Sequence, residues 1–412
     1  MALEWVNKAG FLTVYLVVFL DMLGFGVMIP AIRDLTTALV KNSGLSWPSP
    51  EIFMGFLMAA YSGAQMISAP ILGRLSDVYG RKPVFLVSAI GNLLSYIVWI
   101  LSSSYWPFLL GRLLSGITGG NIAIAQSILA DNTSPEQRPR AMGLLGACIG
   151  MGFVLGPFIG AFMININHKI MININPFWQI GMVPLILALV SVIMIVVNHF
   201  GQVHESAEKG GVLAGLLSIA QPPQNSTYAT QLLSQLSFVS FEVLFAWILQ
   251  RQYGFNLKET YYFFGFQGVL LALVQGGIYR RVEKRRPPAD WVKLGLLGSA
   301  LGMMILPWIG NLTLGQLFGI AGKTVLLSIL LIIMTLSLGF GTPSLNAFAS
   351  LNAPKNEQGQ TMGNMQGLAA LARFVAPVVA TSLYAVWLPL PFLLGGLLCL
   401  AAWLVFSRVR ST

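Results

Sequence analysis

Charged side chains are scarce in this sequence, since only 9% of its 412 residues are Asp, Glu, Lys or Arg. Soluble domains carry about 25% charged residues, so this chain lacks the ionic surface that keeps a protein in water. Cysteine is also scarce, because only Cys148 and Cys399 occur and each lies alone in an apolar run. That excludes a disulfide scaffold and a C-x-x-C site. Hydrophobic residues make up 56% of the chain, which predicts an integral membrane protein.

Several classes of function lack the residues they need. No G-x-x-x-x-G-K-[ST] segment is present to bind a nucleotide. The net charge of +10 comes from short basic segments between apolar runs, not from a continuous face that would bind nucleic acid. An intramembrane enzyme needs a buried nucleophile beside a base, and His168, His199 and His204 all lie at or near connections. We therefore expect no enzyme, no cofactor and no nucleic-acid partner.

Long apolar runs recur along the whole chain. A helix crosses the hydrocarbon core in about 20 apolar residues, and the runs are continuous, unlike the alternating segments of a β-barrel. The first run lacks a cleavage motif, so we expect it to be retained as a helix. We predict an all-α membrane protein with twelve transmembrane helices, beginning near Phe11, Ile52, Pro83, Trp106, Arg140, Phe177, Gln231, Tyr261, Trp291, Lys323, Gly359 and Leu388.

An internal repeat divides the chain. Gly73–Pro83 and Gly277–Pro287 share a glycine, a basic pair and a proline, and the Met-Gly and Pro of 142–157 recur in 362–377. The repeat predicts two six-helix pseudo-repeats that rock about a substrate site near mid-membrane.

The domain boundaries follow from the drop in apolar density between the halves. We expect an N-terminal bundle at 1–199, a cytoplasmic linker at 200–230 and a C-terminal bundle at 231–412. Residue types that can bind metals occur at this linker, namely His199, His204, Glu205 and Glu208, together with Lys209. A hydrated linker explains these polar residues, so we expect no metal site.

The basic residues predict the orientation of the chain. Sixteen of the 24 Lys and Arg lie in the two termini and the even-numbered connections, whereas six lie in the opposite connections. Positive charge prefers the cytoplasmic side, so both termini are expected in the cytoplasm of a multi-pass protein of the cell (inner) membrane. We expect a monomer whose partners are the lipid bilayer, protons and a small-molecule substrate.

The connection that follows the second helix reads Gly73-Arg74-Leu-Ser-Asp77-Val-Tyr-Gly80-Arg81-Lys82. It resembles the G-x-L-x-D-x-x-G-R-R/K motif of the major facilitator superfamily, and the chain is similar to the twelve-helix drug/proton antiporters of that family, such as tetracycline efflux proteins. The resemblance implies that these residues form a conformational latch with an acidic residue that ends the fourth helix, here Asp131. The basic pair would also enforce topology without any latch.

Two glycine-rich helices extend the resemblance. Leu109–Asn121 resembles the family's fourth-helix motif, in which Arg112 is implied to assist proton transfer, although an arginine that caps carbonyls is the alternative. The fifth helix contains Gly152, Gly156, Pro157 and Gly160, which resemble the antiporter motif G-x-x-x-G-P-x-x-G. Small residues four apart let two helices touch, and ordinary close packing explains the same spacing.

Buried charge marks the candidate proton sites. Asp21 lies within Leu20–Pro30, which resembles the antiporters' L-D-x-x-G-x-G-x-x-x-P helix, and about ten residues from either end of its run. A carboxyl group there can carry a proton as access alternates; a neutral Asp hydrogen-bonded in a packed seam is the alternative. Glu242 and Arg373 lie within later helices, where they either pair with each other or take part in proton transport.

Polar residues within the helices are candidates for a substrate cavity, although each could instead form an interhelical hydrogen bond. They are Gln65, Asn121, Gln126, Gln235, Gln267 and Asn346. The resemblance implies a secondary transporter that exports a drug-like amphipathic molecule in exchange for protons. The alternative is a proton-coupled symporter or a facilitator that imports a nutrient or an iron chelate.

Overall fold

A computed structural model describes residues 10–45, 49–133, 138–165, 178–198, 225–282, 285–309, 314–352 and 358–408. Within these ranges no β-strand occurs, and twelve helices are long and apolar enough to cross a membrane. The all-α fold with twelve spans is therefore confirmed. Most of the expected linker, including His199 to Lys209, lies outside the described residues.

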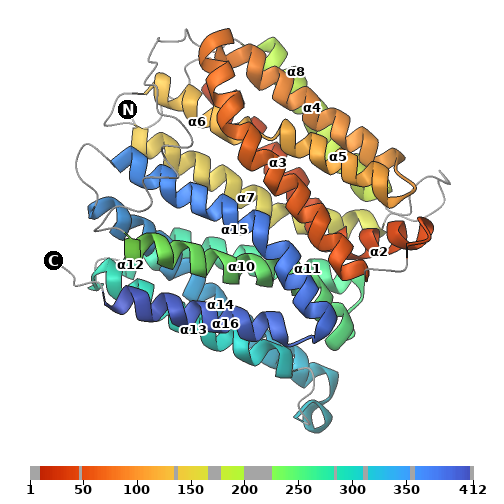
Figure 1. The fold of residues 1–412 in the computed structure, drawn as a ribbon, viewed down its shortest axis with the longest axis vertical. Coiled ribbons are helices and arrows are strands. Elements are labelled where there is room, and N and C mark those ends of the chain that lie inside the picture. The colour runs from red at the N-terminus through yellow and green to blue at the C-terminus, as the bar shows by residue number, and fades with distance from the viewer. Residues whose placement is uncertain are drawn as a thin grey trace. The chain divides into compact units, whose positions relative to one another are not determined.

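The first six spans contain eight α-helices, because two spans are interrupted (Figure 1). The first span consists of α1 (Phe11–Met28), the short 3-10 helix η1 (Ile29–Ala31) and α2 (Ile32–Asn42). Pro30 in η1 has no N–H to donate, which interrupts the α-helical ladder. The others are α3 (Pro50–Tyr79), α4 (Arg81–Leu101), α5 (Tyr105–Ile117), α6 (Asn121–Asp131), α7 (Arg138–Asn165) and α8 (Trp178–Val197).

The later spans begin with α10 (Asn225–Gln252) and end with α16 (Leu390–Ser407). The span after α10 changes from an α-helix to a π-helix, which widens the backbone turn. The remaining elements are α11 (Leu257–Leu273), η3 (Val274–Tyr279), α12 (Arg280–Val282), α13 (Pro288–Ile309), α14 (Leu314–Leu351) and α15 (Gln358–Val386).

The described residues form two compact units. Unit 1 comprises those within Met1–Pro50, Ala60–Lys209 and Leu257–Gly268, and unit 2 comprises those within Glu51–Ala59, Gly210–Asn256 and Val269–Thr412. The start of α3 thus belongs to unit 2, and the start of α11 belongs to unit 1.

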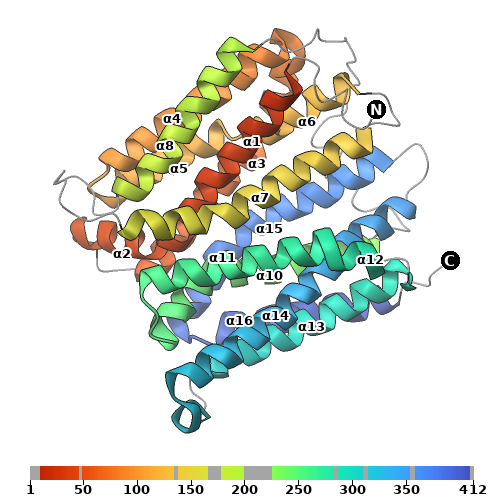
Figure 2. The same ribbon diagram turned by 180° about the vertical axis from the view of Figure 1, so that it is seen from behind.

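In unit 1, α1 packs on α7 and α8, and α4 packs on α5 and α8 (Figure 2). Glycines let the backbones of α1 and α7 approach closely: a Cβ added to Gly156 would lie 2.7 Å from the Cα of Gly26. Tyr261, on the α11 segment of this unit, donates a hydrogen bond of 2.7 Å to the carbonyl of Val27. That contact anchors α11 to the end of α1.

In unit 2, α13 packs on α14 and α16, and α10 packs on α15 and α16. The core includes Phe348 and Phe406, whose rings meet edge to face with centroids 4.9 Å apart. The α3 segment of this unit is held by a hydrogen bond of 3.0 Å from Trp247 Nε1 to Met54 Sδ, and by the ion pair described below. A hydrogen bond and an ion pair therefore both fix the start of α3 in unit 2.

Candidate functional site

The fourth span is interrupted within unit 1. The apolar run that begins near Trp106 predicts one helix, but α5 ends at Ile117 and α6 begins at Asn121 (Figures 1 and 2). The intervening residues are Thr118, Gly119 and Gly120. Two consecutive glycines favour such a break, since glycine loses more conformational freedom in a helix than any other residue.

Polar side chains from neighbouring helices satisfy the carbonyl groups at this break. Ser68 Oγ donates to the carbonyl of Gly116 at 2.8 Å, and Gln65 Nε2 donates to that of Gly119, also at 2.8 Å. Ser88 Oγ donates to the carbonyl of Thr118. Unsatisfied carbonyls are costly inside a membrane protein, so these donors stabilise the interruption. Gln65, a candidate for the substrate cavity, forms an interhelical hydrogen bond here, which is the alternative that the sequence left open.

Asp21 lies beside the first residue after the break. Its side chain is buried, with 8% of the residue exposed, and Asn121 Nδ2 donates a hydrogen bond to its Oδ2. No Lys or Arg in the described ranges forms an ion pair with Asp21. The side-chain oxygen of Asn121, Oδ1, is buried and has no hydrogen-bond partner among the described residues. The site therefore combines a carboxyl group without a counter-charge and an amide with a spare acceptor.

Arg112 occupies a separate position on α5. It is 6% exposed, and its guanidinium carbon lies 5.9 Å from the ring centroid of Tyr61 and 5.8 Å from that of Phe108. Its Nε is buried without a hydrogen-bond partner, and no hydrogen bond from Arg112 to a carbonyl occurs in the described part of the chain. Aromatic faces therefore provide its favourable contacts. Tyr96 is close enough to both Asp21 and Arg112 for their charges to act on it.

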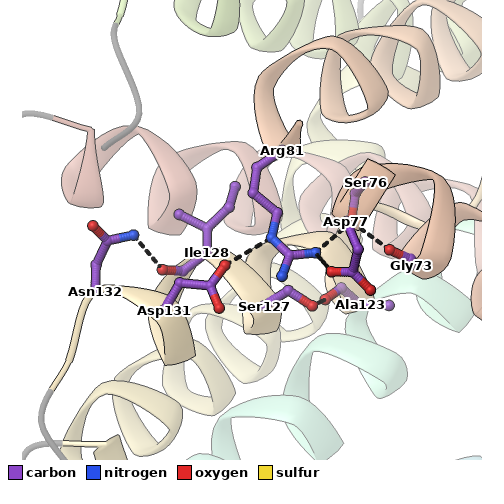
Figure 3. A network of polar contacts seen from close by, with 9 residues as sticks. All are labelled: Gly73, Ser76, Asp77, Arg81, Ala123, Ser127, Ile128, Asp131 and Asn132. Carbon is purple, nitrogen blue, oxygen red and sulfur yellow. Dashed lines mark hydrogen bonds and ion pairs between the residues drawn. The ribbon is translucent and has the colours of Figure 1, made fainter. Parts of the chain in front are cut away.

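The predicted latch residues are partly brought together in unit 1 (Figure 3). Arg81 Nε donates to Asp131 Oδ2 at 2.8 Å, and its Nη1 donates to Ser76 Oγ at 2.6 Å and pairs with Asp77. The side chains of Arg81 and Asp131 are only 10% and 12% exposed. Charge-assisted hydrogen bonds of this kind are stronger than neutral ones. Arg81 thus ties the end of α6 to the end of α3.

The other predicted latch residues have smaller roles in this network. Gly80 has a φ of +92°, a left-handed conformation that glycine adopts without strain, so the expected turn is present. Ser76 Oγ donates to the carbonyl of Gly73, whereas Lys82 Nζ donates to the carbonyl of Val196 near the end of α8. The side chain of Arg74 lies outside the described residues.

The glycine motif of the fifth span forms the seam between α7 and α1. A Cβ on Gly152 would lie 2.6 Å from the Cβ of Met22, and one on Gly160 would lie 2.1 Å from the ring of Tyr261. Pro157 lies inside α7. Gly152 and Gly156 thus lie at close contacts with α1, whereas Gly160 contacts a side chain on α11.

Glu242 and Arg373 both belong to unit 2, on α10 and α15. They are within electrostatic range of each other, but they form no ion pair among the described residues. Glu242 is half-buried and Arg373 is exposed. The pair that the sequence suggested is therefore not closed in this conformation.

The remaining cavity candidates are divided between the units: Gln126 and Gln267 belong to unit 1, and Gln235 and Asn346 belong to unit 2. Gln126 is exposed, and Gln267 and Asn346 are half-buried. Gln235 lines a cavity inside unit 2. Among the described residues, no three His, Cys, Asp or Glu come together in a way that could hold a metal ion.

Sequence reasoning missed several polar contacts. Ser68 and Ser88 donate hydrogen bonds to carbonyls at the helix break. The Thr-Gly-Gly triplet could have indicated that such donors are needed, because a helix break leaves carbonyl groups unpaired. Glu51 also pairs with Arg251 at 3.1 Å, although the two residues are 200 positions apart in the sequence. Long-range pairs of this kind leave no mark in local spacing.

Comparison with known proteins adds the family. The sequence pattern of the Major Facilitator Superfamily matches residues 11–377. The class H tetracycline resistance protein of Pasteurella multocida is 26% identical over 416 residues, which cover 95% of this chain and 94% of that protein. Major facilitator superfamily domain-containing protein 10 of Bos taurus is 28% identical over 423 residues, covering 91% and 86%.

Solved structures share the fold. The human organic anion transporter MFSD10 (TETRAN) has a TM-score of 0.69 and 23% identity, over 96% of this chain and 98% of that one. A D-xylose-proton symporter has a TM-score of 0.75 and 16% identity, over 97% of both chains.

Proposed function

The chain belongs to the Major Facilitator Superfamily, and we propose that this multi-pass membrane transporter exports a small amphipathic, drug-like molecule in exchange for protons by alternating access. The expected bundles, 1–199 and 231–412 with a linker between them, are the bodies that would rock. The proposed location is the cell (inner) membrane, with both termini in the cytoplasm, and the protein would act as a monomer. The tetracycline resistance proteins among its relatives support a drug-like substrate.

The observation that carries the proposal is the environment of Asp21. Its carboxyl group is buried and accepts a hydrogen bond from Asn121, and it forms no ion pair within the described ranges. Gain or loss of its proton therefore breaks no ion pair. The helix break beside it provides irregular backbone at membrane depth, which membrane proteins tolerate where it is buried in protein or lines a water-filled cavity. Asp21 is accordingly the proposed proton carrier.

The other candidate residues support the carrier. Arg112 is buried in the same unit as Asp21, and its fixed charge would assist proton release from a carboxyl group that comes near it as the protein changes conformation. Glu242 and Arg373 would form or break their pair as the bundles rock. The Arg81–Asp131 ion pair would latch one conformation, and the α1–α7 glycine seam would let the helices slide.

The energy of a proton gradient suffices for export. Each charge moved through 100 mV is worth about 2.3 kcal/mol. That is equivalent to a substrate gradient of about fifty-fold.

The sign of a pH change tests the direction of coupling. Purified protein is reconstituted in vesicles that contain a pH-sensitive dye, with equal pH inside and outside, and tetracycline is added outside. Under exchange, tetracycline enters as protons leave, so the lumen becomes more alkaline. Under symport the lumen becomes more acidic. A panel of amphipathic amines and neutral aromatic drugs extends the assay beyond tetracycline.

The variant Asp21→Asn is expected to abolish the pH change and still fold, because asparagine keeps the size and the hydrogen-bonding capacity of the side chain. Asp34→Asn is the matched control, since Asp34 lies in the same unit and already pairs with its neighbour Arg33 at 3.2 Å. Coupled flux that survives in Asp21→Asn would show that Asp21 is not the carrier. Acidification of the lumen by the wild-type protein would indicate proton-coupled import and would contradict the proposed export.

A further inference from the structure

A cavity lies inside unit 2, whereas Asp21, Arg112 and the latch residues all belong to unit 1. It holds about 570 Å³ of space between atoms, including the part that opens outward. Its walls come from α10, α13, α14 and α16. All the lining residues belong to unit 2, so the cavity is complete within this unit.

Helical spacing explains why the walls face one another. On α13 the lining residues recur at intervals of three and four, from Val292 through Ser299 to Met303, and the same intervals recur on α10 and α14. Glycines then set the width: a Cβ on Gly295 would lie 2.7 Å from the Cα of Gly341. The backbones of α13 and α14 touch there, and small side chains leave the facing space unfilled.

Polar groups in the cavity lack partners. Ser299 is only 9% exposed, yet its hydroxyl forms no hydrogen bond, and neither Gln235 nor Thr342 forms one in the described structure. By contrast, Ser337, on the same wall, donates to the carbonyl of Ile333 at 2.8 Å. Ser237 accepts from Cys399 Sγ at 3.2 Å, which leaves its own hydrogen unassigned. Gln235 and Thr342 are half-buried, so these groups are able to bond a ligand in the cavity that can both donate and accept.

The walls also define the charge of that ligand. Among the described residues, no Asp, Glu, Lys, Arg or His lines the cavity, and a charged group buried without a partner is strongly disfavoured. Phe238 and Phe241 supply aromatic faces, and Met303 and Met334 supply thioethers, which pack well on aromatic rings. An uncharged ring with hydroxyl or carbonyl substituents satisfies both features.

We propose that this cavity is a binding site for a neutral aromatic molecule, or for a neutral ring of a larger one, held by hydrogen bonds to Gln235, Ser299 and Thr342. The identification of this ligand as exported cargo rests on the proposed function. Recognition and proton carriage then occur in different units, because Asp21 lies in unit 1. The two are coupled by conformational change and not by competition for one site.

The test uses resorcinol, a neutral ring with two hydroxyls, and isophthalate as its charged counterpart of similar shape. Binding to purified full-length protein is measured by equilibrium dialysis. Resorcinol is expected to bind saturably and isophthalate is not. A lost hydrogen bond costs about fivefold in affinity, so the triple variant Gln235→Leu, Ser299→Ala, Thr342→Val is expected to weaken binding about tenfold or more. Ser240→Ala is the control, since that hydroxyl, also on α10, donates to the carbonyl of Leu236.

A second readout locates the ligand without any substitution. Cys399 lines the cavity, whereas the other cysteine, Cys148, is also buried but lies in unit 1. Resorcinol is expected to slow methanethiosulfonate labelling of Cys399 and to leave that of Cys148 unchanged, as followed by peptide mass spectrometry. Equal protection of both cysteines, or of neither, would overturn the assignment, as would binding that the triple variant leaves intact. If resorcinol binds but no pH-coupled flux is measured, the proposed export is refuted while the assignment of this binding site still holds.

Discussion

Replacing Gly156 by alanine should separate two helices that now touch. The added Cβ would lie 2.6 Å from the carbonyl carbon of Gly26 and 2.7 Å from the nitrogen of Val27. An ordinary contact begins at 3.4 Å, so α1 and α7 must move apart by roughly 0.8 Å. Both obstacles are backbone atoms, which cannot rotate away as a side chain can. Overpacking of this kind costs about 1–3 kcal/mol.

Gly150→Ala is the matched control for this substitution. Gly150 lies on the same helix, but nothing lies within 4 Å of its added Cβ. Alanine is a better helix former than glycine by about 1 kcal/mol, so stability should stay the same or rise. Both variants are heated in detergent, and the fraction that still elutes as a single species is measured by size-exclusion chromatography. A loss of several degrees is expected for Gly156→Ala alone. Equal melting of the two variants would refute the idea that a backbone contact limits this seam.

Three further predictions concern polar contacts. A double-mutant cycle with Arg81→Gln and Asp131→Asn should give a coupling of about 1–3 kcal/mol in thermal unfolding, because both side chains are nearly buried. The same cycle on Arg251 and Glu51 should give about 0–1 kcal/mol, since the arginine side chain is 56% exposed. A larger coupling for this second pair than for the first would contradict the idea that burial strengthens the ion pair. Gln65→Leu should lower stability by about 1–3 kcal/mol, because a carbonyl at the helix break loses its donor, and unchanged melting would show that water replaces the amide.

The helices were predictable because lipid imposes a simple rule on sequence. Apolar runs of about 20 residues appear wherever a helix crosses the membrane, and all twelve predicted runs correspond to spans in the structure. The turn at Gly80 was also predictable from the sequence, since a left-handed turn between two helices favours glycine. The four-residue spacing of small side chains indicated that Gly152, Gly156 and Gly160 allow a close helix contact, but the partner of Gly156, Gly26, is known only from the structure. Local composition carries all three features.

The site was harder to predict because its contacts join distant segments. Gln65 and Asn121 had the same description in the sequence, a polar residue in an apolar run, yet one supports a carbonyl and the other holds Asp21. The break at Thr118–Gly120 lies inside a continuous apolar run, so hydropathy alone could not reveal it. Whether Glu242 meets Arg373 depends on the conformation of unit 2, which no spacing along the chain determines.

The start of α3 belongs to unit 2 and the start of α11 belongs to unit 1, and this exchange affects how the protein can be split into fragments. Residues 51–59 complete unit 2, and residues 257–268 complete unit 1. A fragment that stops in the linker would therefore lack the tyrosine that caps α1, and its complementary fragment would lack the glutamate that neutralises Arg251. Split versions should mature only when both pieces are synthesised in the same cell, with each fragment serving as an assembly partner for the other.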